Sequence, residues 1–330
     1  MSYKNEEKEH WLSILAQVPS VDLHCDALSA VKNGAKLAER RNKGHFDLQR
    51  MKEGGLWVEV LSIFVNPQWY IGEARWRAVE KQLRRLEEAL SASDEWRLVT
   101  NPKDIEKNKS SGKRSLILEI EGLHPIEDKP DRIQELWERG VRIFTLTWNN
   151  SNRFATSCMD KDDVGLKPDG KEMVKSITKM GGIIDLSHAS EKTFFDVLEM
   201  GITPILSHSA LRRHKNSKRN ATDEMVRQLG EAGGIIGINF FPGFLSTKSY
   251  SKVTSLDIIK HIATACELGG EDLVALGSDF DGVKHLPKDI PDASYFWVIA
   301  RNLSQNGFEN DTIFNIMGRN FINFWQRTVK

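Results

Sequence analysis

Short apolar runs, each ending in polar or charged residues, recur along the chain and alternate with charged, amphipathic stretches. The runs are rich in Val, Ile and Leu, which is typical of strands buried on both faces of a parallel sheet. Eight such strand–helix units predict an α/β protein with a (β/α)8 TIM barrel, and a doubly wound open sheet is the main alternative. The predicted strands cover residues 21–26, 57–65, 115–121, 141–148, 182–188, 203–208, 234–241 and 274–279.

Two of the intervening helices carry clear boundary signals. Ser190 precedes an amphipathic stretch at 191–199, and a glycine follows its end. Thr222 precedes a second stretch at 223–231, whose first turn is acidic. Hydroxyl side chains cap helix amino termini, and acidic residues are favourable in the first turn. We therefore predict helices at both places.

Two further stretches are strongly charged. Residues 73–91 are long and amphipathic, which predicts a helix of the outer ring with a solvated face. Residues 101–114 read as a solvated loop with room for a short helix. No internal repeat, low-complexity block or linker interrupts the pattern, so we expect residues 1–330 to form a single barrel domain.

The composition narrows the classes of function. Lys+Arg and Asp+Glu both total 46, so the formal net charge is zero and nothing points to nucleic acid. The amino terminus, MSYKNEEKEHW, is charged, and no apolar segment follows, so we expect neither a signal peptide nor a membrane association. Cys25, Cys158 and Cys266 are few and far apart. A cytoplasmic location without disulfides is the expectation.

Polar residues with metal-binding chemistry gather at the carboxyl ends of the predicted strands. In a parallel barrel these ends form one face, where active sites are built. Residues two apart in a strand share a side, so the first strand directs its histidine and aspartate the same way and Cys25 the other way. The converging residues are His24, Asp26, Glu121, His188, His208 and Asp279.

Imidazole and carboxylate groups are ligands of zinc, and a catalytic zinc usually takes three protein ligands. Five or six converging ligands therefore predict two ions. Each residue alone has an ordinary structural explanation: Asp26 as a helix cap, His188 or His208 as a donor to a backbone carbonyl. Accidental placement of the whole set at separate strand ends explains the pattern less well than a metal site.

Other histidines and Cys25 are assigned weaker roles. His124 follows Glu121 closely and is a candidate for supporting a ligand. Cys25 is expected to be a small core residue rather than a thiolate ligand. We read the remaining histidines as surface or structural residues: His10, His45, His214, His261 and His285.

At these residues the sequence resembles the membrane (renal) dipeptidase family, zinc metallopeptidases with an amidohydrolase-like barrel. The similarity runs in order along nearly the whole chain, and its specificity comes from the set of motifs rather than from any single one. The motifs are DLHCD (22–26), EIEG (119–122), FTLTWNNSN (144–152), IIDLSHAS (183–190), PILSHSALR (204–212), KRNATDEMVRQL (218–229) and ALGSDFDGV (275–283).

The resemblance implies two zinc ions per chain. His24 and Asp26 would hold one ion, and His188 and His208 would hold the other. Glu121 would bridge the two. The resemblance also implies the activity, a zinc-dependent dipeptidase that uses a metal-bridging hydroxide and tolerates a D-residue at the second position.

Two more residues take roles through the same resemblance. Asp279 would be the acid/base residue. Arg219 would bind the terminal carboxylate of the substrate, a role that suits a guanidinium because it pairs with carboxylates in a bidentate way. The ordinary explanation of Arg219 is a surface residue of the basic run RRHKNSKR.

One position departs from the family pattern. Family members carry a histidine after the LT of the fourth-strand motif, where it contacts the substrate; Trp148 stands here. Tryptophan cannot accept a proton and has one N–H to donate. Asn149 or Asn150 would then supply a hydrogen-bond donor. The change is expected to affect the reaction rate and the range of substrates more than the metal site. A bacterial, cytoplasmic subgroup fits this departure.

Two other functions stay open from the sequence. One is another binuclear metal amidohydrolase that acts on a lactone, a cyclic amide or a phosphoester, since barrels of this kind support many reactions. The other is a non-catalytic metal-binding scaffold, which the presence of all five ligands and Asp279 disfavours. The expected partner is a small dipeptide, without nucleic acid or membrane, and a homodimer stays open.

Overall fold

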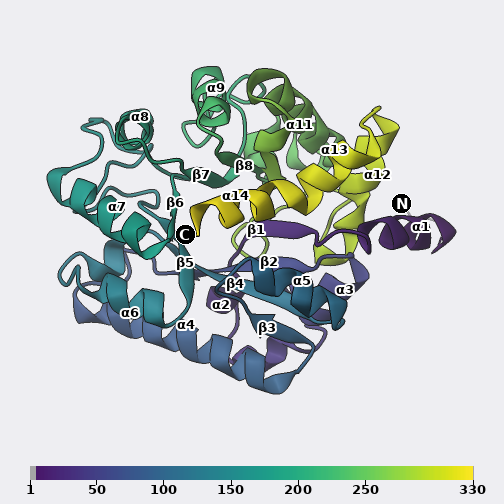
Figure 1. Ribbon diagram of the computed structural model, residues 1–330, viewed down its shortest axis with the longest axis horizontal. Helices are drawn as coiled ribbons and strands as arrows, with labels where there is room; N and C mark the ends of the chain where they lie inside the picture. The colour runs from purple at the N-terminus through teal and green to yellow at the C-terminus, as the bar shows by residue number, and fades with distance from the viewer. Residues whose placement is uncertain (1–4, 330) are drawn as a thin grey trace.

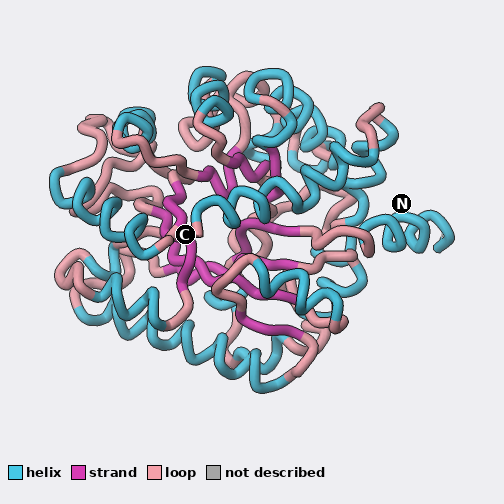
Figure 2. The backbone as a smooth tube through the Cα atoms, in the orientation of Figure 1, coloured by secondary structure: helices cyan, strands magenta, loops and turns pink. Residues whose placement is uncertain are grey.

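The computed structural model describes residues 5–329, in which a ring of parallel strands is surrounded by helices (Figures 1 and 2). Successive strands of the ring are neighbours, and Cys25 closes it through a parallel bridge to Phe280. The predicted TIM barrel is therefore confirmed against the open-sheet alternative. The ring contains β1 (Val21–Cys25), β2 (Val58–Phe64), β4 (Arg114–Glu121), β5 (Val141–Thr145), β6 (Ile183–Asp185), β7 (Ile205–Ser209), β8 (Ile235–Ile238) and β9 (Val274–Leu276).

Helices pack around this ring, and both predicted caps are confirmed. Ser190 accepts a hydrogen bond from the Thr193 amide at the start of α8, and Thr222 accepts one from the Met225 amide at the start of α9. The helices are α1 (Asn5–Leu15), α2 (Ala27–Ala30), α3 (Leu48–Glu53), α4 (Glu73–Ala92), α5 (Lys103–Ser110), α6 (Arg132–Glu138), α7 (Pro168–Met180), α8 (Glu191–Glu199), α9 (Asp223–Glu231), α10 (Pro242–Leu245), α11 (Ser255–Gly269), α12 (Trp297–Gln305), α13 (Asn310–Phe314) and α14 (Asn320–Thr328).

The last helix closes the amino-terminal end of the barrel. Phe321, Phe324 and Trp325 of α14 form one apolar cluster with residues at the starts of strands, such as Val58 and Ile205. In Figure 1 α14, drawn in yellow, lies across the ring of strands. With this end filled by apolar side chains, polar chemistry is confined to the opposite, carboxyl-terminal end.

Four strands end three residues before their predicted ends, namely β5, β6, β8 and β9. His188 and Asp279 lie in these overhangs, with φ of 67° and 65°. Such left-handed backbone cannot continue a strand ladder. These two overhangs, LSH (186–188) and GSD (277–279), already contain polar residues, and the chain has left the strand there.

Two other differences lie at the outer surface. A short strand that the pattern did not predict, β3 (Trp96–Leu98), pairs with β4 outside the ring. The stretch 101–114, predicted as a loop with a short helix, contains α5 and ends in the first residue of β4. All three cysteines are free. Among residues 5–329, none of the helices has both the length and the apolar character needed to cross a bilayer.

Candidate metal centre

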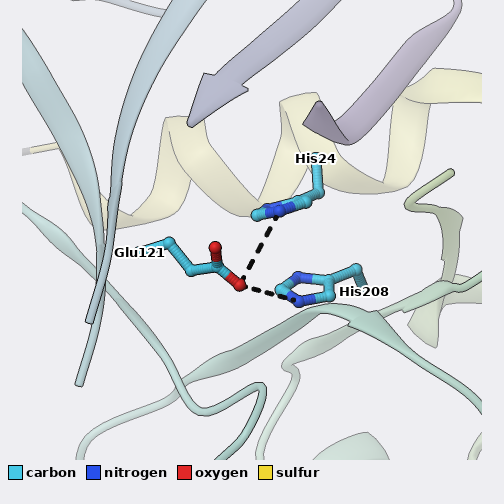
Figure 3. Close-up of side chains that lie close together, drawn as sticks. All are labelled: His24, Glu121 and His208. Carbon is cyan, nitrogen blue, oxygen red and sulfur yellow. Dashed lines mark ion pairs between the residues drawn. The ribbon is translucent and has the colours of Figure 1, made fainter. Parts of the chain in front are cut away.

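Three imidazoles converge on one carboxylate oxygen at the carboxyl-terminal mouth of the barrel. Oε1 of Glu121, the last residue of β4, lies 2.9 Å from Nε2 of His188, 3.5 Å from Nε2 of His208 and 3.9 Å from Nε2 of His24. Figure 3 shows His24 and His208 approaching Glu121 from their own strands. The structure therefore brings together residues from four strand ends, as the spacing predicts.

Each imidazole uses its other nitrogen, Nδ1, for a protein partner. The partners are the Glu119 carboxylate at 2.8 Å for His24, the Asn149 side-chain oxygen at 2.9 Å for His188, and the Ser207 hydroxyl at 2.8 Å for His208. When Nδ1 carries the proton and donates it, the Nε2 lone pair stays free. All three lone pairs then point into the same small volume, which is what a metal site requires.

Two aspartates complete the centre on the side of His24. Oδ2 of Asp26 lies 3.4 Å from Nε2 of His24. His24, Asp26 and Asp279 offer ligand atoms that all lie within 4.8 Å of one another, and His24, Glu121 and His208 form a second such group. Cys25, between His24 and Asp26, is buried in the apolar core. His24 thus belongs to both of these overlapping groups of candidate ligands.

The electrostatics of the cluster fit a cation. Burial lowers the pKa of His188 and of His208 well below the ordinary value, so both rings are neutral and able to coordinate. Burial raises the pKa of Glu121 well above the ordinary value, and the nearby Asp26 raises it further. Nε2 of His24 is buried and has no hydrogen-bond partner among residues 5–329. A divalent ion would satisfy this nitrogen and relieve the repulsion between the carboxylates.

A polar network inside the barrel supports the ligands from below. The Thr145 hydroxyl lies 2.6 Å from a Glu119 oxygen and 2.7 Å from an Asp185 oxygen. Asp185 accepts from the Ser207 amide and hydroxyl, each at 2.8 Å. Because Glu119 and Ser207 are the partners of His24 and His208, the network fixes the orientation of two of these imidazoles at once.

A cavity of about 250 Å³ opens beside the ligands. Arg219 lines it and is only 7% exposed, yet its Nε has no hydrogen-bond partner among the described residues. Its Nη2 donates to the His208 carbonyl at 3.1 Å. By contrast, the neighbouring Arg212 and Arg213 pair with Glu191 and Asp223. Arg219 is therefore not a surface residue of the basic run; it is a buried cation facing the cavity.

Asp279 also lines the cavity and is held by an amide that the sequence pattern did not single out. Nδ2 of Asn239 donates to Oδ2 of Asp279 at 3.0 Å and to the His208 carbonyl at 3.3 Å. The same carbonyl accepts from Arg219. One backbone oxygen thus connects a metal-ligand candidate, the buried arginine and the amide that holds Asp279. The only sequence signal for Asn239 was a single polar residue inside the apolar run predicted as a strand at 234–241.

Trp148 and Asn149 both line the cavity. The Trp148 ring packs against Phe64 at 4.9 Å and lies 6.2 Å from the His188 ring. The oxygen of Asn149 is engaged by His188, which leaves its Nδ2 group to meet a ligand. His124 lies beneath this segment, and its Nε2 donates to the Asn150 carbonyl at 3.0 Å. His124 therefore supports the Trp148 loop rather than a metal ligand directly.

A second aspartate steadies the loop that carries Asp279. Asp281, also left-handed with φ of 63°, accepts a hydrogen bond from the His45 amide at 2.6 Å and pairs with the Arg41 guanidinium. The Asp281 amide donates to Nδ1 of His45 at 3.1 Å. His45, read from the sequence as surface or structural, is a structural residue here. It ties the segment after β1 to the segment after β9.

Comparison with known proteins agrees with this arrangement. The family model described as membrane dipeptidase, peptidase family M19, matches residues 8–330. An uncharacterized dipeptidase of Schizosaccharomyces pombe is 28% identical over 98% of this chain and 84% of its own length. Dipeptidase tcpJ of Claviceps purpurea is 29% identical over 84% of this chain and 68% of its own length.

Solved structures share the fold. A probable dipeptidase, PvdM, from Pseudomonas aeruginosa has a TM-score of 0.88 with 20% identity and covers 99% of both chains. A metallo peptidase from Rhodobacter sphaeroides, liganded with a phosphinate mimic of the dipeptide L-Ala-D-Ala, has a TM-score of 0.86 with 23% identity, over 94% of this chain and 99% of that one. The family match over nearly the whole sequence and the converging imidazoles and carboxylates lead to one conclusion: the chain belongs to the membrane dipeptidase family, peptidase family M19, and is a metal-dependent dipeptidase.

Proposed function

We propose that this chain hydrolyses dipeptides that have a free terminal carboxylate, with two zinc ions at the barrel mouth. The observation that carries the proposal is Arg219, a buried guanidinium without an acidic partner among residues 5–329, in the same cavity as the three imidazoles. A buried, unpaired cation is costly unless a ligand supplies the anion. A dipeptide brings that carboxylate together with the amide bond to be cut.

His24 and Asp26 would hold one ion, His188 and His208 the other, and Glu121 would bridge them. The closeness of Nε2 in His188 and in His208, 2.9 Å apart with both rings neutral, supports their sharing one ion. Bound divalent ions supply Lewis acidity to the scissile carbonyl and lower the pKa of a water molecule. Zinc is proposed because the ligands are imidazoles and carboxylates.

Asp279 would move the proton. It lines the cavity beside the ligands, and burial raises the pKa of its carboxyl, which makes it a better proton acceptor. Asn239 occupies Oδ2, so Oδ1 would take the proton from the attacking water and deliver it to the nitrogen of the departing amine. Arg219 would meanwhile hold the carboxylate end and fix the amide bond over the ligands.

Trp148 and Asn149 would contact the substrate near the scissile bond. The Asn149 Nδ2 group and the single indole N–H are the donors available in place of the family histidine. A second residue of D configuration fits the proposal, because the Rhodobacter sphaeroides relative was solved with a mimic of L-Ala-D-Ala. A cytoplasmic location remains part of the proposal, supported by the three cysteines, which are far apart in the chain and free.

Replacing Arg219 tests the proposal. A charge-assisted hydrogen bond contributes about 1.5–3 kcal/mol, so Arg219→Ala should lower kcat/KM at least about 10-fold on dipeptides with a free carboxylate. C-terminally amidated dipeptides should already be poor substrates of the wild type, and the substitution should change them little. Arg213→Ala, in the same loop but paired with Asp223 on the surface, is the matched control. Equal cleavage of free and amidated dipeptides by the wild type would contradict the carboxylate role.

Metal content is the second test. Elemental analysis of protein loaded with zinc and freed of excess should give two ions per chain. His188→Ala should lose one ion more readily than both, because His24 and Asp26 remain as a pair. One ion or none in the wild type would contradict the binuclear proposal while leaving the family assignment intact.

A further inference from the structure

Two phenylalanines flank the buried arginine. Phe244 of α10 places its ring 5.4 Å from the Arg219 guanidinium, and Phe241, just before α10, packs edge-to-face against Phe244 at 5.0 Å. Both rings line the cavity, and both are partly exposed rather than buried in the core. An apolar surface therefore stands next to the only guanidinium among the residues that line this cavity.

This aromatic pair is held in place from behind. Phe241 packs edge-to-face against Tyr250 at 5.5 Å. A side chain at Gly243 would come within 2.5 Å of the Phe241 ring and 2.8 Å of the Tyr250 hydroxyl, so glycine permits this packing. The Phe241 amide donates to Oδ1 of Asn239 at 2.6 Å, and Asn239 also holds Asp279. The pair is thus built into the same framework as the proposed acid/base residue.

The position of Arg219 determines which part of a dipeptide meets these rings. In a dipeptide, the Cα of the carboxyl-terminal residue is bonded directly to the terminal carboxylate. If the guanidinium holds that carboxylate, this Cα must lie close to Arg219. The side chain on that Cα must then lie beside whatever flanks the guanidinium, which is the Phe241–Phe244 pair. Apolar side chains gain from contact with partly exposed rings, and aromatic ones gain further from edge-to-face geometry.

We propose that the Phe241–Phe244 pair selects dipeptides whose carboxyl-terminal residue is apolar, with aromatic residues favoured most. This inference rests on the proposed function, because it takes the carboxylate role of Arg219 as its starting point. An acidic or basic side chain at the same place would lose water of hydration against the rings without gaining an ion pair from them. Glycine would leave the rings uncovered.

The test compares carboxyl-terminal residues at a constant amino-terminal alanine. Wild-type, zinc-loaded protein should show kcat/KM about 10-fold or more higher on L-Ala-L-Phe than on Ala-Gly or L-Ala-L-Asp, the range typical of discrimination by an apolar pocket. Phe241→Ala should bring the ratio between L-Ala-L-Phe and Ala-Gly toward one. Phe241 is chosen because the structure gives it no contact with the guanidinium. Phe195→Ala, a partly exposed phenylalanine of α8 outside the cavity, should leave the ratio as it is.

The outcomes separate this inference from the proposed function. Cleavage of the three dipeptides at equal efficiency would overturn the selection by the phenylalanines while the dipeptidase proposal stands. A wild-type preference for the acidic substrate, or an unchanged ratio in Phe241→Ala with normal metal content and melting temperature, would overturn it as well. No cleavage of any of the three would overturn the proposed function and the inference together. If the Phe241→Ala variant fails to fold, the relative kcat/KM of the wild type on the three dipeptides still tests the predicted preference.

Discussion

At the scale of single side chains, the centre depends on which ring nitrogen each histidine leaves free. Three chemically different groups occupy Nδ1: a carboxylate on His24, an amide oxygen on His188 and a hydroxyl on His208. A carboxylate partner makes an imidazole the most basic of the three. Burial lowers the pKa of His24, but Glu119, Asp26 and Glu121 outweigh it and the pKa is raised. As metal ligands, the three histidines would therefore be unequal donors.

The clearest prediction at this scale concerns Asp279. Asp279→Asn keeps the size of the side chain and removes its ability to take a proton, so kcat should fall by about 10²–10⁴-fold. The metal ions should stay, because the other candidate ligands are untouched. Steady-state kinetics and metal analysis on the same preparation measure both. A near-normal kcat would remove Asp279 from the chemistry; loss of metal would instead make it a ligand.

The sequence identifies functional residues when their side chains have a shared chemical use, such as binding a metal. His24, Asp26, Glu121, His188 and His208 stand out because imidazoles and carboxylates at strand ends have a joint use. Asn239 and Glu119 did not stand out, although each holds a reactive group or ligand in place. An amide or carboxylate that acts by orienting a neighbour has no spacing rule, since its partner can lie anywhere in the chain. Only the folded arrangement identifies it.

At the scale of elements, the loop after β9 packs closely against the candidate metal centre. A side chain at Gly282 would come within 2.2 Å of an Asp26 oxygen and 2.3 Å of an Asp279 oxygen. Gly282→Ala should therefore displace one or both carboxylates, weakening metal retention by at least about 10-fold, in the range seen when groups that orient ligands are altered. Competition with a chelator followed by metal analysis measures this.

A glycine in open space provides the control for that substitution. Gly112 has nothing within 4 Å of an added Cβ but has a left-handed φ of 73°, so Gly112→Ala carries backbone strain without touching the centre. It should cost some stability and leave metal retention unchanged. Equal metal retention in Gly282→Ala and the wild type would contradict the prediction. It would show that the loop can move to accommodate the added methyl group without displacing Asp26 or Asp279.

The elements themselves were largely predictable, and their ends were not. Apolar runs fixed the existence of eight strands because each is buried on both faces. The left-handed turns at His188 and Asp279 escaped prediction because nothing in the local apolar pattern marks where the ladder stops. The strand β3 escaped because its three residues have no alternation of their own and depend on the edge of β4.

At the scale of the whole molecule, one buried acid should set part of the dependence of stability on pH. Glu59 of β2 is fully buried, and neither of its oxygens has a hydrogen-bond partner among residues 5–329. Burial raises its pKa well above 4.5, and the nearby Asp22 raises it further. The folded state therefore holds this proton more tightly than the unfolded chain, whose pKa is ordinary. The free energy of unfolding should fall as the pH rises above about 4.5.

Glu59→Gln removes this penalty, so its gain in stability over the wild type should grow with pH, by up to about 1.4 kcal/mol per pH unit while the folded carboxyl keeps its proton. Urea unfolding between pH 5 and 8, with both proteins at the same zinc concentration, measures the difference. Glu80→Gln, at an exposed position on α4, is the control and should show no such trend. Parallel curves for Glu59→Gln and the wild type would contradict the assignment.

The closure of the barrel sets the order in which the centre can be assembled during synthesis. His24 and Asp26 belong to the first strand, whereas the groups that close the ring beside them come from the far end of the chain: Ser278 donates to Asp22 across 256 positions, and the Asp26 amide bonds to Phe280. At about 5–20 residues per second, a ribosome makes the second group roughly 10–50 s after the first. Until β9 emerges, the ring of strands around these two candidate ligands is still open. Metal loading should accordingly be a late event in the life of a nascent chain, and a truncated product that ends before β9 should lack both Asp279 and the closed mouth of the barrel.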